Sequence, residues 1–467
     1  MLSDRPVKVM VIGGGGREHA ICWKLVQSPM LESLYCLPGN GGTAALAKTS
    51  NIETLTVTET KEGVESKKEL RLRDLRPSDF PHIAKFAKDK EIDLVVIGPD
   101  NPLADGIVDQ LEAAGLRVFG PKQAAAQLES SKAFAKEFMV RHNIPTARHE
   151  TLESHEDAVD FIRKNDWARV VKVDGLALGK GVFVCDNETE TRDALQIIFR
   201  ENRFGDSGKK VVLEERLVGE EMSLLMFCDG KSLVPMPASQ DHKRRFDGDK
   251  GPNTGGMGVF APVELYSRCK DVIETDVIAP LRKAIESGAI AYKGILYVGL
   301  LVVKEQSSNG AHKHPSPFGG NYKPYVLEFN ARFGDPETQV ILPLLESDLL
   351  EILWSCTDGT LAERQINWSD RAACCVIACA ESYPEGSSKG EEIKVGESKN
   401  GTLIFHSGTK LEGDRLLSAG GRVLGITALG KSLNEAIDHA YEGIKSVSFN
   451  GMAYRKDIGR RTVSGCP

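Results

Sequence analysis

The chain has 467 residues, of which 41% are hydrophobic and 27% charged, and its formal net charge is -7. These values exclude a disordered or fibrous protein and predict a globular one, with roughly three domains at ~100 to 200 residues per domain. Mild acidity disfavours nucleic acid as the main partner. The first residues lead into a short strand without a signal-peptide segment, and no apolar run approaches the ~20 residues of a membrane span. We therefore expect a cytoplasmic protein without a nucleic-acid or membrane partner.

Residues 7 to 120 alternate short apolar strands with helical segments, which predicts a parallel, doubly wound α/β sheet. The expected strands are 7–12, 34–37, 93–98 and 117–120, and the expected helices begin near residue 18 and span 103–114. Eleven of the 18 residues from Glu59 to Arg76 are charged, so this stretch cannot be core. We expect it to form a solvated insertion at one edge of the sheet.

The first strand runs into the glycine turn Gly13–His19 and then into a helix. Such a turn lets backbone N–H groups approach a phosphate, and the helix dipole adds to the attraction. Dinucleotide binding is the obvious competitor. However, Glu18 or His19, depending on the register, replaces the third glycine of the dinucleotide fingerprint, and no acidic residue follows the second strand.

Arg17, directly after the glycines, favours a sugar phosphate as the ligand of this turn. Asn40 and Asp100 each lie shortly after a predicted strand and are available for the hydroxyl groups of the sugar. The alternative is a tight structural turn with a solvated arginine.

A second unit, of α+β type, is predicted to begin near 125–145, where Ser130 and Ser131 cap a helix that Pro145 closes. Its expected elements are strands 169–173, 182–185, 211–217 and 222–227, a helix at 190–200, a loop-rich stretch at 238–262, and strands 294–303 and 325–330 joined by a polar connector, 306–324. A helix at 347–356 leads to a small α+β cap with strands 372–380, 402–406 and 422–428 and a helix at 433–446. Ten cysteines without any C-x-x-C pair favour structural thiols over a zinc site.

A second glycine loop, Val171–Gly181, is expected between two strands of this unit. Lys172 lies on the first strand and Lys180 at the end of the loop, so one cation is fixed and another is carried by a flap. This arrangement suits the polyphosphate of a nucleotide. It is not a Walker A loop, because the G-x-x-x-x-G-K-[ST] order is absent. A plain hairpin is the alternative.

The segment Leu213–Ser223 could bind adenine through its backbone. An edge strand that leaves its sheet can present the carbonyl of Glu214 and the N–H of Leu217 to the adenine amino group and ring nitrogen. Glu221 could then accept from ribose hydroxyls. A charged surface hairpin is the alternative.

The loop Ser239–Gly258 is long, ionic and rich in glycine, and such loops in compact chains are usually functional or disordered. Its glycines indicate backbone shaped around a ligand. Asp241 could hold an ammonium group, and Lys243 or Arg244 an anion.

Glu328 and Asn330 lie two residues apart on a predicted strand, so their side chains share one face. A carboxylate and an amide oxygen suit a hard cation such as Mg²⁺, whose remaining ligands are usually phosphate oxygens and water. The alternative is a strand-end glutamate that pairs with Arg332.

Together these segments resemble the ATP-grasp ligases, and specifically the glycinamide ribonucleotide synthetase family. The resemblance covers nearly the whole chain and rests on GGGGREHA at 13–20, PGNGGTA at 38–44, SKAFAKEF at 131–138, IPTA at 144–147, VDGLALGKGV at 173–182, GEEMS at 219–223, SQDHKR at 239–244, GPNTGGMG at 251–258, EFNARFGDPETQ at 328–339 and RKDIG at 455–459. It implies an N-terminal phosphoribosylamine-binding domain over 1–125, an ATP-grasp core of two α+β subdomains over 126–350 with a mobile flap at 145–220, and a C-terminal domain over 351–467.

The resemblance also implies roles for individual residues. ATP and its metal, Mg²⁺ or Mn²⁺, are expected on Lys132, Lys172, Asp174, Gly175, Gly179, Lys180, Gly181, Glu214, Leu217 and Glu221, with Glu328 and Asn330 as metal ligands. The small-molecule substrates, glycine and 5-phosphoribosylamine, are expected on Gly15, Gly16, Arg17, Glu18, Asn40, Gly41, Asp100, Asn253 and Gly255. Catalysis is expected from Arg332, Asp241, Lys243 and Asp335, in a monomer or a weak dimer.

Departures from the family pattern are modest. Asp100 stands where members often have glutamate, and this difference affects only the expectation that Asp100 binds the ribose. Leu178 replaces an alanine that is usual in the flap. The insertions at 59–76 and 306–324 are unusual. The chain ends after the ligase region, so we expect none of the activities fused to some eukaryotic members.

Members of the family join glycine to 5-phosphoribosylamine with ATP, in the second step of purine synthesis. A carboxylate is a poor acylating agent, so we hypothesise that glycine is first converted to glycyl phosphate, which the amine of phosphoribosylamine then attacks. Here Arg332 would stabilise the transferring phosphoryl group, and flap closure would exclude water. Arg332 could instead be a structural partner of Asp335 or Glu337. The open alternatives for the whole chain are an ATP-grasp ligase for another acid or amine, a catalytically silent nucleotide-binding protein, and an NAD-dependent oxidoreductase.

Overall fold

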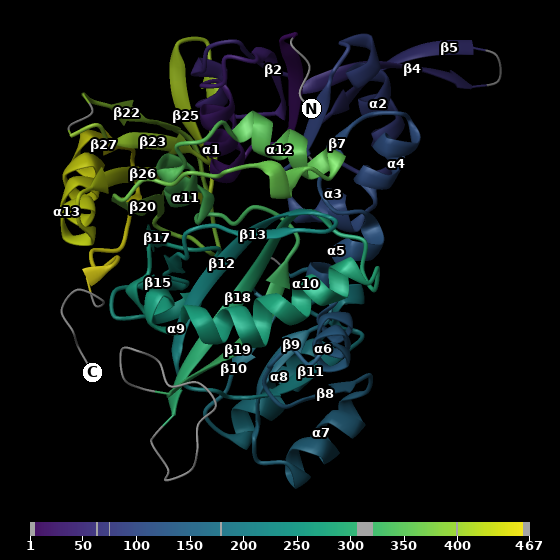
Figure 1. Ribbon diagram of the computed structural model, residues 1–467, viewed down its shortest axis with the longest axis vertical. Helices are drawn as coiled ribbons and strands as arrows, with labels where there is room; N and C mark the ends of the chain where they lie inside the picture. The colour runs from purple at the N-terminus through teal and green to yellow at the C-terminus, as the bar shows by residue number, and fades with distance from the viewer. Residues whose placement is uncertain are drawn as a thin grey trace.

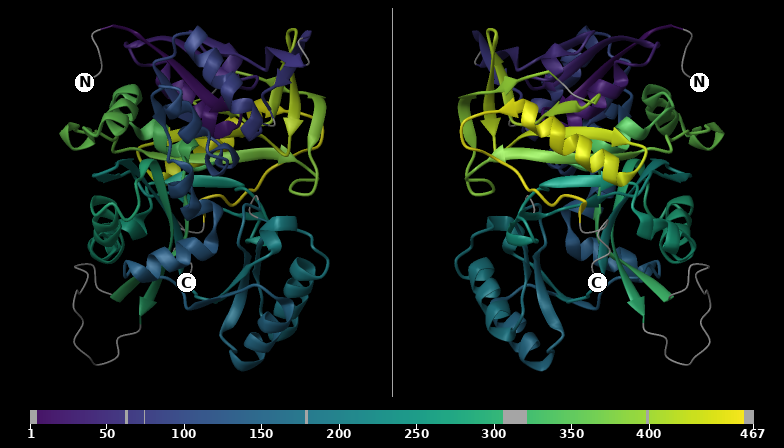
Figure 2. Two further views of the ribbon diagram at one scale, coloured as in Figure 1. Left: turned by 90° about the vertical axis from the view of Figure 1, so that its right-hand side faces the viewer. Right: turned by 90° about the vertical axis from the view of Figure 1, so that its left-hand side faces the viewer.

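The structure is a computed structural model that describes residues 5–61, 64–73, 75–177, 180–305, 321–397 and 400–460. Its N-terminal and C-terminal sheets lie side by side at one end of the molecule (Figure 1). A small four-stranded subdomain occupies the opposite end, as the two side views in Figure 2 show. A central sheet joins the two ends, and the expected α/β and α+β multidomain fold is confirmed.

The N-terminal sheet is parallel, as predicted. It has five strands in the order β3-β2-β1-β6-β7, of which β3 was not predicted. Its elements are β1 (Val7–Gly13), α1 (Gly16–Leu25), β2 (Leu31–Pro38), β3 (Thr49–Asn51), α2 (Phe80–Asp89), β6 (Leu94–Ile97), α3 (Asp100–Ala104), α4 (Ile107–Ala113) and β7 (Val118–Phe119). The single helix predicted at 103–114 was wrong. It is divided at Gly106, whose φ of +82° is left-handed and interrupts the helix.

The charged insertion forms an antiparallel hairpin of β4 (Thr54–Lys61) and β5 (Val64–Arg71). The hairpin is a two-stranded sheet of its own and projects from the N-terminal domain at the upper right of Figure 1. It begins five residues before the predicted insertion. Residues 62, 63 and 74 of that insertion lie outside the described residues.

The small subdomain is an antiparallel sheet in the order β10-β9-β11-β8 with its own hydrophobic core. Its elements are β8 (His149–Leu152), α7 (His155–Lys164), β9 (Ala168–Val173), β10 (Val182–Val184), α8 (Glu188–Phe199) and β11 (Val211–Glu215). The prediction that Glu214 lies on an edge strand was wrong, because β11 pairs with β9 on one side and β8 on the other.

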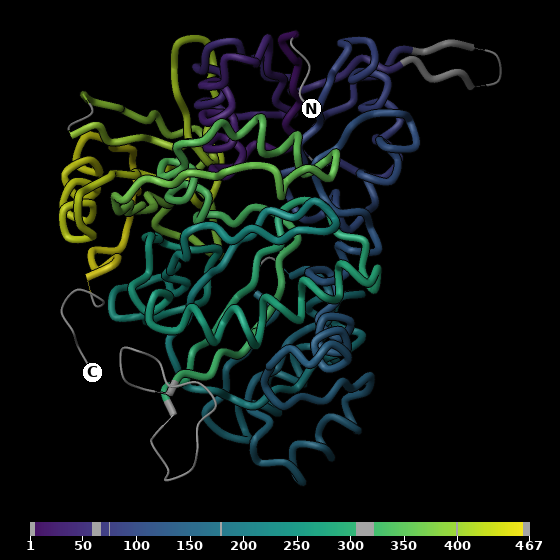
Figure 3. Tube along the Cα trace, in the orientation of Figure 1, coloured from purple at the N-terminus to yellow at the C-terminus, as the bar shows by residue number. Residues whose placement is uncertain are grey.

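The central sheet has the order β13-β12-β18-β19, and Figure 3 follows the chain of β18 and β19 through the middle of the molecule. Its strands are β12 (Glu220–Asp229), β13 (Leu233–Pro235), β18 (Lys293–Glu305) and β19 (Asn321–Asn330), and the nearby helices are α5 (Gln123–Ser130), α6 (Lys132–Arg141), α9 (Glu264–Ile273), α10 (Ala279–Glu286) and α12 (Leu349–Asp358). The helix α11 (Thr338–Leu344) packs instead on α1 and on three strands of the C-terminal sheet. The predicted connector ends earlier than expected, because 321–324 already belong to β19, and residues 306–320 lie outside the described residues.

The C-terminal sheet has the order β14-β17-β20-β26-β23, and its first two strands come from the stretch predicted as loop-rich. These strands are β14 (Gln240–Asp241) and β17 (Gly258–Ala261), with the hairpin β15 (Arg244–Phe246) and β16 (Lys250–Asn253) between them. The rest of the domain contains β20 (Ala372–Ala380), β21 (Ser388–Glu392), β22 (Lys394–Val395), β23 (Leu403–His406), β24 (Thr409–Glu412), β25 (Arg415–Gly420), β26 (Arg422–Gly430), α13 (Leu433–Gly443), β27 (Val447–Ser448) and β28 (Met452–Ala453). The stretch at 238–262 therefore contributes two strands, β14 and β17, to the sheet of the C-terminal domain.

The nine described cysteines are buried and free. Over the described ranges, no helix is long and apolar enough to cross a membrane.

Candidate active site

The glycine turn lies where three parallel strands end together. The register pairs Gly13 with Pro38 and Ile12 with Ile97, so the loops after β1, β2 and β6 meet at one edge of the sheet. Glu18 is buried in this turn, and its carboxylate accepts from the Gly15 N–H at 2.6 Å and from Arg17 Nε at 2.7 Å. Arg17 also donates through Nη1 to the carbonyl of Phe333, 3.2 Å away, so its guanidinium faces the ATP-grasp core.

Asn40 is buried between the two glycine loops and organises both. Its amide nitrogen donates to the carbonyls of Gly14, Gly15 and His406 at 2.7 to 3.2 Å. Its amide oxygen accepts from the N–H groups of the next loop, those of Gly42 and Thr43. These contacts use the side chain that was predicted to face a sugar hydroxyl. Asn40 thus shapes the two glycine loops and connects them to the C-terminal domain.

Neighbouring glycines pack closely in the same loops. A Cβ on Gly14 would lie 2.4 Å from the carbonyl oxygen of Gly39, and one on Gly16 would lie 2.5 Å from Ser407 Oγ. The Gly41 N–H donates to Thr409 Oγ1 at 3.2 Å. The loops are therefore built against each other and against the C-terminal domain.

Asp335 joins the N-terminal, ATP-grasp and C-terminal parts of the molecule. Its carboxylate pairs with Arg422 Nη2 at 2.8 Å and accepts from Gln339 Nε2 at 2.7 Å. Burial opposes its charge, but Arg422 and Arg17 hold the pKa of Asp335 below its ordinary value. Arg422 also donates to the carbonyls of Asp335 and Gly255, and so reaches the predicted substrate loop. Sequence reasoning missed Arg422, which no motif marks.

Asp241 is half-buried beside Gly256, whose φ is +111° and whose Cβ would lie 2.7 Å from Asp241 Oδ1. Among the described residues, Asp241 Oδ1 has no hydrogen-bond partner. Burial and the nearby charge of Glu337 raise the pKa of Asp241 well above its ordinary value. Glu337 itself accepts from Tyr297 Oη at 2.7 Å and from Ser223 Oγ at 3.2 Å. A buried carboxyl oxygen without a partner is suited to meet a substrate amine.

Lys243 brings three separately predicted segments together. Its Nζ lies 3.8 Å from Glu328 Oε1 on β19 and 3.8 Å from Glu221 Oε2 on β12. These two carboxylates raise the pKa of Lys243 although burial opposes the shift. In turn, burial would raise the pKa of Glu328, but Lys243, with Lys132, Lys172 and Arg332, lowers it to about 2. The carboxylate proposed for the metal is therefore ionised and surrounded by cations.

The register of β19 positions Glu328. Gly299 pairs with Glu328 and Leu300 with Val326, so Leu327 is the extra residue of a bulge. Asn330 follows on the same strand, opposite Tyr297. The two side-chain oxygens predicted to bind a metal, those of Glu328 and Asn330, therefore both come from the end of β19 in the central sheet.

Arg332 pairs with Glu129 at 2.9 Å and faces Asp100 at 3.8 Å. These are its carboxylate partners, rather than Asp335 or Glu337, which the sequence suggested. Burial opposes the charge, but Glu129 and Asp100 raise the pKa of Arg332. Its Nη2 also lies 3.5 Å from Asn330 Oδ1. Glu129 was missed because it precedes Arg332 by about 200 residues and ends a different helix.

Glu214 is buried between two lysines. Its Oε1 pairs with Lys172 Nζ at 2.8 Å and its Oε2 with Lys136 Nζ at 3.0 Å. Lys172 also donates to the carbonyl of Leu327 at 3.1 Å, which connects the small subdomain to β19. Lys136, which sequence reasoning missed, is 2% exposed, and burial lowers its pKa to about 8.

The flap begins at Asp174, which is anchored to the start of α6. The Asp174 carboxylate accepts from the Ala133 N–H at 2.8 Å and from Ser131 Oγ at 3.0 Å. Its carbonyl accepts from the N–H of Lys132 at 3.1 Å. At the other end of the flap, the carbonyl of Gly181 accepts a hydrogen bond from the Val173 N–H at the end of β9, at 2.9 Å. Lys180 is exposed in the flap, and the predicted Gly179 lies outside the described residues.

The remaining predicted residues lie at the edges of the site. Leu217 is half-buried just after β11, and Gly175 lies against Ser207 at the other end of the small subdomain sheet. Asn253 ends β16, and the Gly255 N–H donates to Tyr383 Oη at 2.9 Å.

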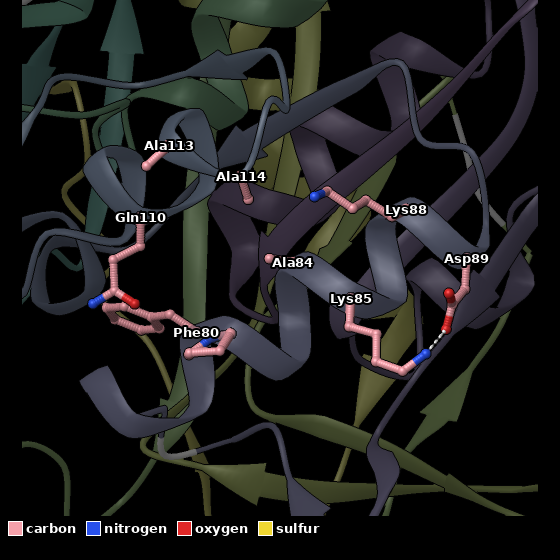
Figure 4. A pocket seen from close by; sticks show the side chains of 9 residues that line it. Phe80, Ala84, Lys85, Lys88, Asp89, Gln110, Ala113 and Ala114 are labelled. Carbon is pink, nitrogen blue, oxygen red and sulfur yellow. Dashed lines mark hydrogen bonds and ion pairs between the residues drawn. The ribbon is translucent and has the colours of Figure 1, made fainter.

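A shallow groove between α2 and α4 contains none of these residues (Figure 4). Its floor is Phe80 and Ala84, and Lys85 at its rim pairs with Asp89 on its own helix at 2.7 Å. It provides no convergent buried polar groups, so we do not include it in the site.

Three domains of one family match the chain. The N domain of phosphoribosylglycinamide synthetase matches residues 7–129, its ATP-grasp (A) domain 130–338 and its C domain 373–461. The chain belongs to this family. The resemblance inferred from the motifs is confirmed.

Named relatives match nearly the whole of this chain. A phosphoribosylamine–glycine ligase of Caldanaerobacter subterraneus is 41% identical over 453 residues, which are 97% of this chain and 99% of that protein. The trifunctional purine biosynthetic protein adenosine-3 of Gallus gallus is 44% identical over 99% of this chain but only 43% of its own length. The crystal structure of a Thermotoga maritima phosphoribosylamine–glycine ligase superposes with a TM-score of 0.74, 31% identity, and coverage of 97% and 100% of the two chains.

Proposed function

We propose that this chain joins glycine to 5-phosphoribosylamine with ATP and forms glycinamide ribonucleotide, ADP and phosphate through glycyl phosphate. The observation that carries the proposal is the position of Lys243, which brings the substrate loop to the carboxylates of Glu328 and Glu221. The names of its relatives and the ATP-grasp match support the same reaction. It is a carbon–nitrogen ligase of purine synthesis.

Phosphoribosylamine would bind at the edge of the N-terminal sheet. The backbone of Gly15 and Gly16 at the start of α1 would approach its phosphate, where the helix end favours an anion. Arg17, placed by Glu18, would add a positive charge. The backbone at Gly41, shaped by Asn40, and Asp100 at the start of α3 would face the sugar, and Asn253 and Gly255 would close the substrate loop over it.

ATP would lie between the small subdomain and the central sheet. Lys132 and Lys172 would hold its phosphates under the flap from Asp174 to Gly181, which includes Gly175, Gly179 and Lys180. Adenosine would contact the segment after β11 through the backbone of Glu214 and Leu217 and the carboxylate of Glu221. Because β11 is interior, Glu214 lies within both ladders of the sheet, whereas Leu217 lies beyond the last pair, Glu215 with Ala168.

Glu328 and Asn330 would hold Mg²⁺ or Mn²⁺. The fit rests on two hard oxygens from one strand face and on a Glu328 carboxylate whose pKa is lowered to about 2. The bound ion supplies charge neutralisation between phosphate groups.

The catalytic roles follow from charge and position. A carboxylate is a poor acylating agent, so the γ-phosphoryl group must first be transferred to an oxygen of glycine, and the amine then displaces phosphate. Lys243 and Arg332 would neutralise charge on the transferring group. Asp241, with its unpartnered oxygen, would hold a substrate ammonium group or take its proton. Asp335 would fix the substrate loop through Arg422.

We further propose that the enzyme is cytoplasmic and a monomer or a weak dimer. Its functional units would be 1–125, 126–350 with the mobile flap at 145–220, and 351–467.

The test is the substrate dependence of ADP formation. We expect purified enzyme with Mg·ATP to form ADP only when glycine and phosphoribosylamine are both present. ADP formation with a different acid or amine would favour another ATP-grasp ligase. Nucleotide binding without turnover, or turnover of NAD, would favour the remaining alternatives and contradict the proposal.

A further inference from the structure

The segment Arg455–Gly459 near the C-terminal end has no role in the reaction described so far. It follows α13 in the chain and runs alongside the hairpin of β15 and β16. That hairpin lies inside the loop that carries Asp241 and Lys243. The segment comes from one domain and the loop from another, so any contact between them couples the two.

Arg455 is 1% exposed and makes an unusually full set of contacts. Its Nε and Nη2 donate to the two carboxylate oxygens of Asp457, each at 2.8 Å. Its Nη1 donates to the carbonyl of Arg244 at 3.0 Å and pairs with Asp249 at 2.9 Å. A bidentate, charge-assisted pair of this kind fixes geometry as well as charge.

Two further bonds tie the same segment to the tip of the hairpin. Asp457 Oδ2 accepts from the Gly248 N–H at 2.9 Å, and the Lys456 N–H donates to Asp247 Oδ1 at 2.8 Å. Gly248 and Asp249 have φ values of +75° and +52°, so the turn has a left-handed backbone that these contacts hold in place. The segment therefore holds the hairpin at its first strand, β15, and at its turn.

The end of the segment reaches the residue between the two reactive side chains. The Gly459 N–H donates to His242 Nε2 at 3.2 Å. Because Nε2 accepts this bond, the proton of the neutral ring lies on Nδ1. Burial, and then the charge of Arg455, lowers the pKa of His242 to about 4, so the ring is neutral near pH 7.

We propose that Arg455, Asp457 and the N–H of Gly459 form a clasp that positions Asp241 and Lys243 for the reaction. Arg455 and Asp457 are positioning residues, since they touch the loop and not the reacting groups. The clasp holds the hairpin at 244–249 and fixes the ring of His242, and the two reactive side chains flank that ring in sequence. This inference rests on the proposed function, because it assigns an effect on that reaction.

The decisive variant is Asp457→Asn. It keeps the size of the side chain and an acceptor for Gly248, but removes the charge that orients Arg455. The matched control is Asp438→Asn, since Asp438 is exposed and pairs with Arg460 of the same C-terminal region at 3.5 Å. Arg455→Lys keeps the positive charge but loses the guanidinium group that donates two hydrogen bonds to Asp457. It serves as the second variant if Asp457→Asn does not fold.

We expect Asp457→Asn to lower kcat, measured well below the Tm, by about 10- to 100-fold, as a misplacement of about 1 Å can do, with the Kd for ATP close to wild type. The Tm should fall as well, because the buried Arg455 loses the charge of one of its two carboxylate partners. Trypsin should cut faster at Arg244, Arg245 and Lys250, and ¹⁵N NMR should show that His242 no longer holds a single Nδ1–H tautomer. The Asp438→Asn control should match wild type in every measurement.

The clasp is overturned if Asp457→Asn behaves like the control, or if the loss of activity disappears at saturating ATP and at a temperature well below the Tm. Its failure is distinguishable from failure of the proposed function. If the wild-type enzyme forms no ADP with glycine and phosphoribosylamine, the proteolysis and the NMR signal of His242 still report whether the clasp holds the loop.

Discussion

Glu328 is the residue on which most of the site's positive charge converges. Lys243, Lys132, Lys172 and Arg332 all lower its pKa, although burial opposes them. A carboxylate held in this way remains ionised and available to a divalent cation at any pH at which the enzyme works. It is therefore the side chain whose removal should change the site most.

We expect Glu328→Gln to lower Mg²⁺-dependent turnover by about 10²-fold or more, because the amide keeps the shape and loses the charge that holds the cation. Activity would be titrated with Mg²⁺ and with Mn²⁺. The control is Glu220→Gln, an exposed residue at the start of β12, which should leave the titration unchanged. Full Mg²⁺-dependent activity in Glu328→Gln would exclude the proposed metal site.

The same pair of proteins tests the charge of Glu328 through stability. The pKa of Glu328 is lowered from 4.5 to about 2 in the folded protein, so its stabilising contribution is complete above pH 4.5 and is lost as pH falls toward 2. The difference in the free energy of unfolding between wild type and Glu328→Gln should therefore shrink between these pH values. A constant difference over that range would show that the carboxylate is not held by the four cations.

At the scale of elements, the small subdomain is connected to the central sheet by a buried charge cluster. Glu214 on β11 pairs with Lys172 on β9 and Lys136 on α6, and Lys172 donates to Leu327 on β19. Two lysines and one glutamate leave one positive charge in excess. Lys136 thus balances the negative charge of Glu214, so that the positive charge of Lys172 remains for the phosphate groups that ATP would place there.

We expect Lys136→Met to raise the KM for ATP, because Glu214 would then be paired by Lys172 alone. It should also destabilise the protein by about 3 kcal/mol, since a partner of a buried carboxylate is removed. Steady-state kinetics and denaturant unfolding measure the two effects. Arg141→Met, on the exposed end of the same helix, should change neither quantity. An unchanged KM in Lys136→Met would refute the charge argument.

The sequence indicated elements correctly where burial is periodic and local. Apolar runs such as Val7–Ile12 and Ala372–Ala380 predicted β1 and β20 because their side chains are buried on both faces. β14 and β17 were missed, because two- and four-residue strands gain their stability from pairing, and β17 pairs with β20 more than 100 residues away. The glycine turn, the flap and the oxygen pair were visible as motifs.

Partners distant in sequence could not be predicted. Arg332 meets Glu129, and Asp335 meets Arg422, only after the domains pack. A lone glutamate at a helix end or an arginine at the start of a strand has no pattern that marks it. The five hydrogen bonds by which the Asn40 side chain holds the loops could not be predicted either, because their partners come from separate loops.

At the scale of the whole molecule, the site is built from every domain. Asn40 links the N-terminal loops to His406, Asp335 links the core to Arg422, and Arg332 links β19 to Glu129 and Asp100. The C-terminal domain is therefore part of the framework of the candidate site, through the strands β14 and β17 and through the proposed clasp. We infer that the reaction requires the three domains in one chain.

The central claim is that glycine is activated by phosphoryl transfer before the amine attacks. Glycine labelled with ¹⁸O in its carboxylate tests this claim most directly. The attacking carboxylate oxygen stays with phosphorus when the amine displaces phosphate, so mass spectrometry should find one ¹⁸O in each phosphate released and one in the product. Product formed with phosphate that carries no ¹⁸O would contradict the account.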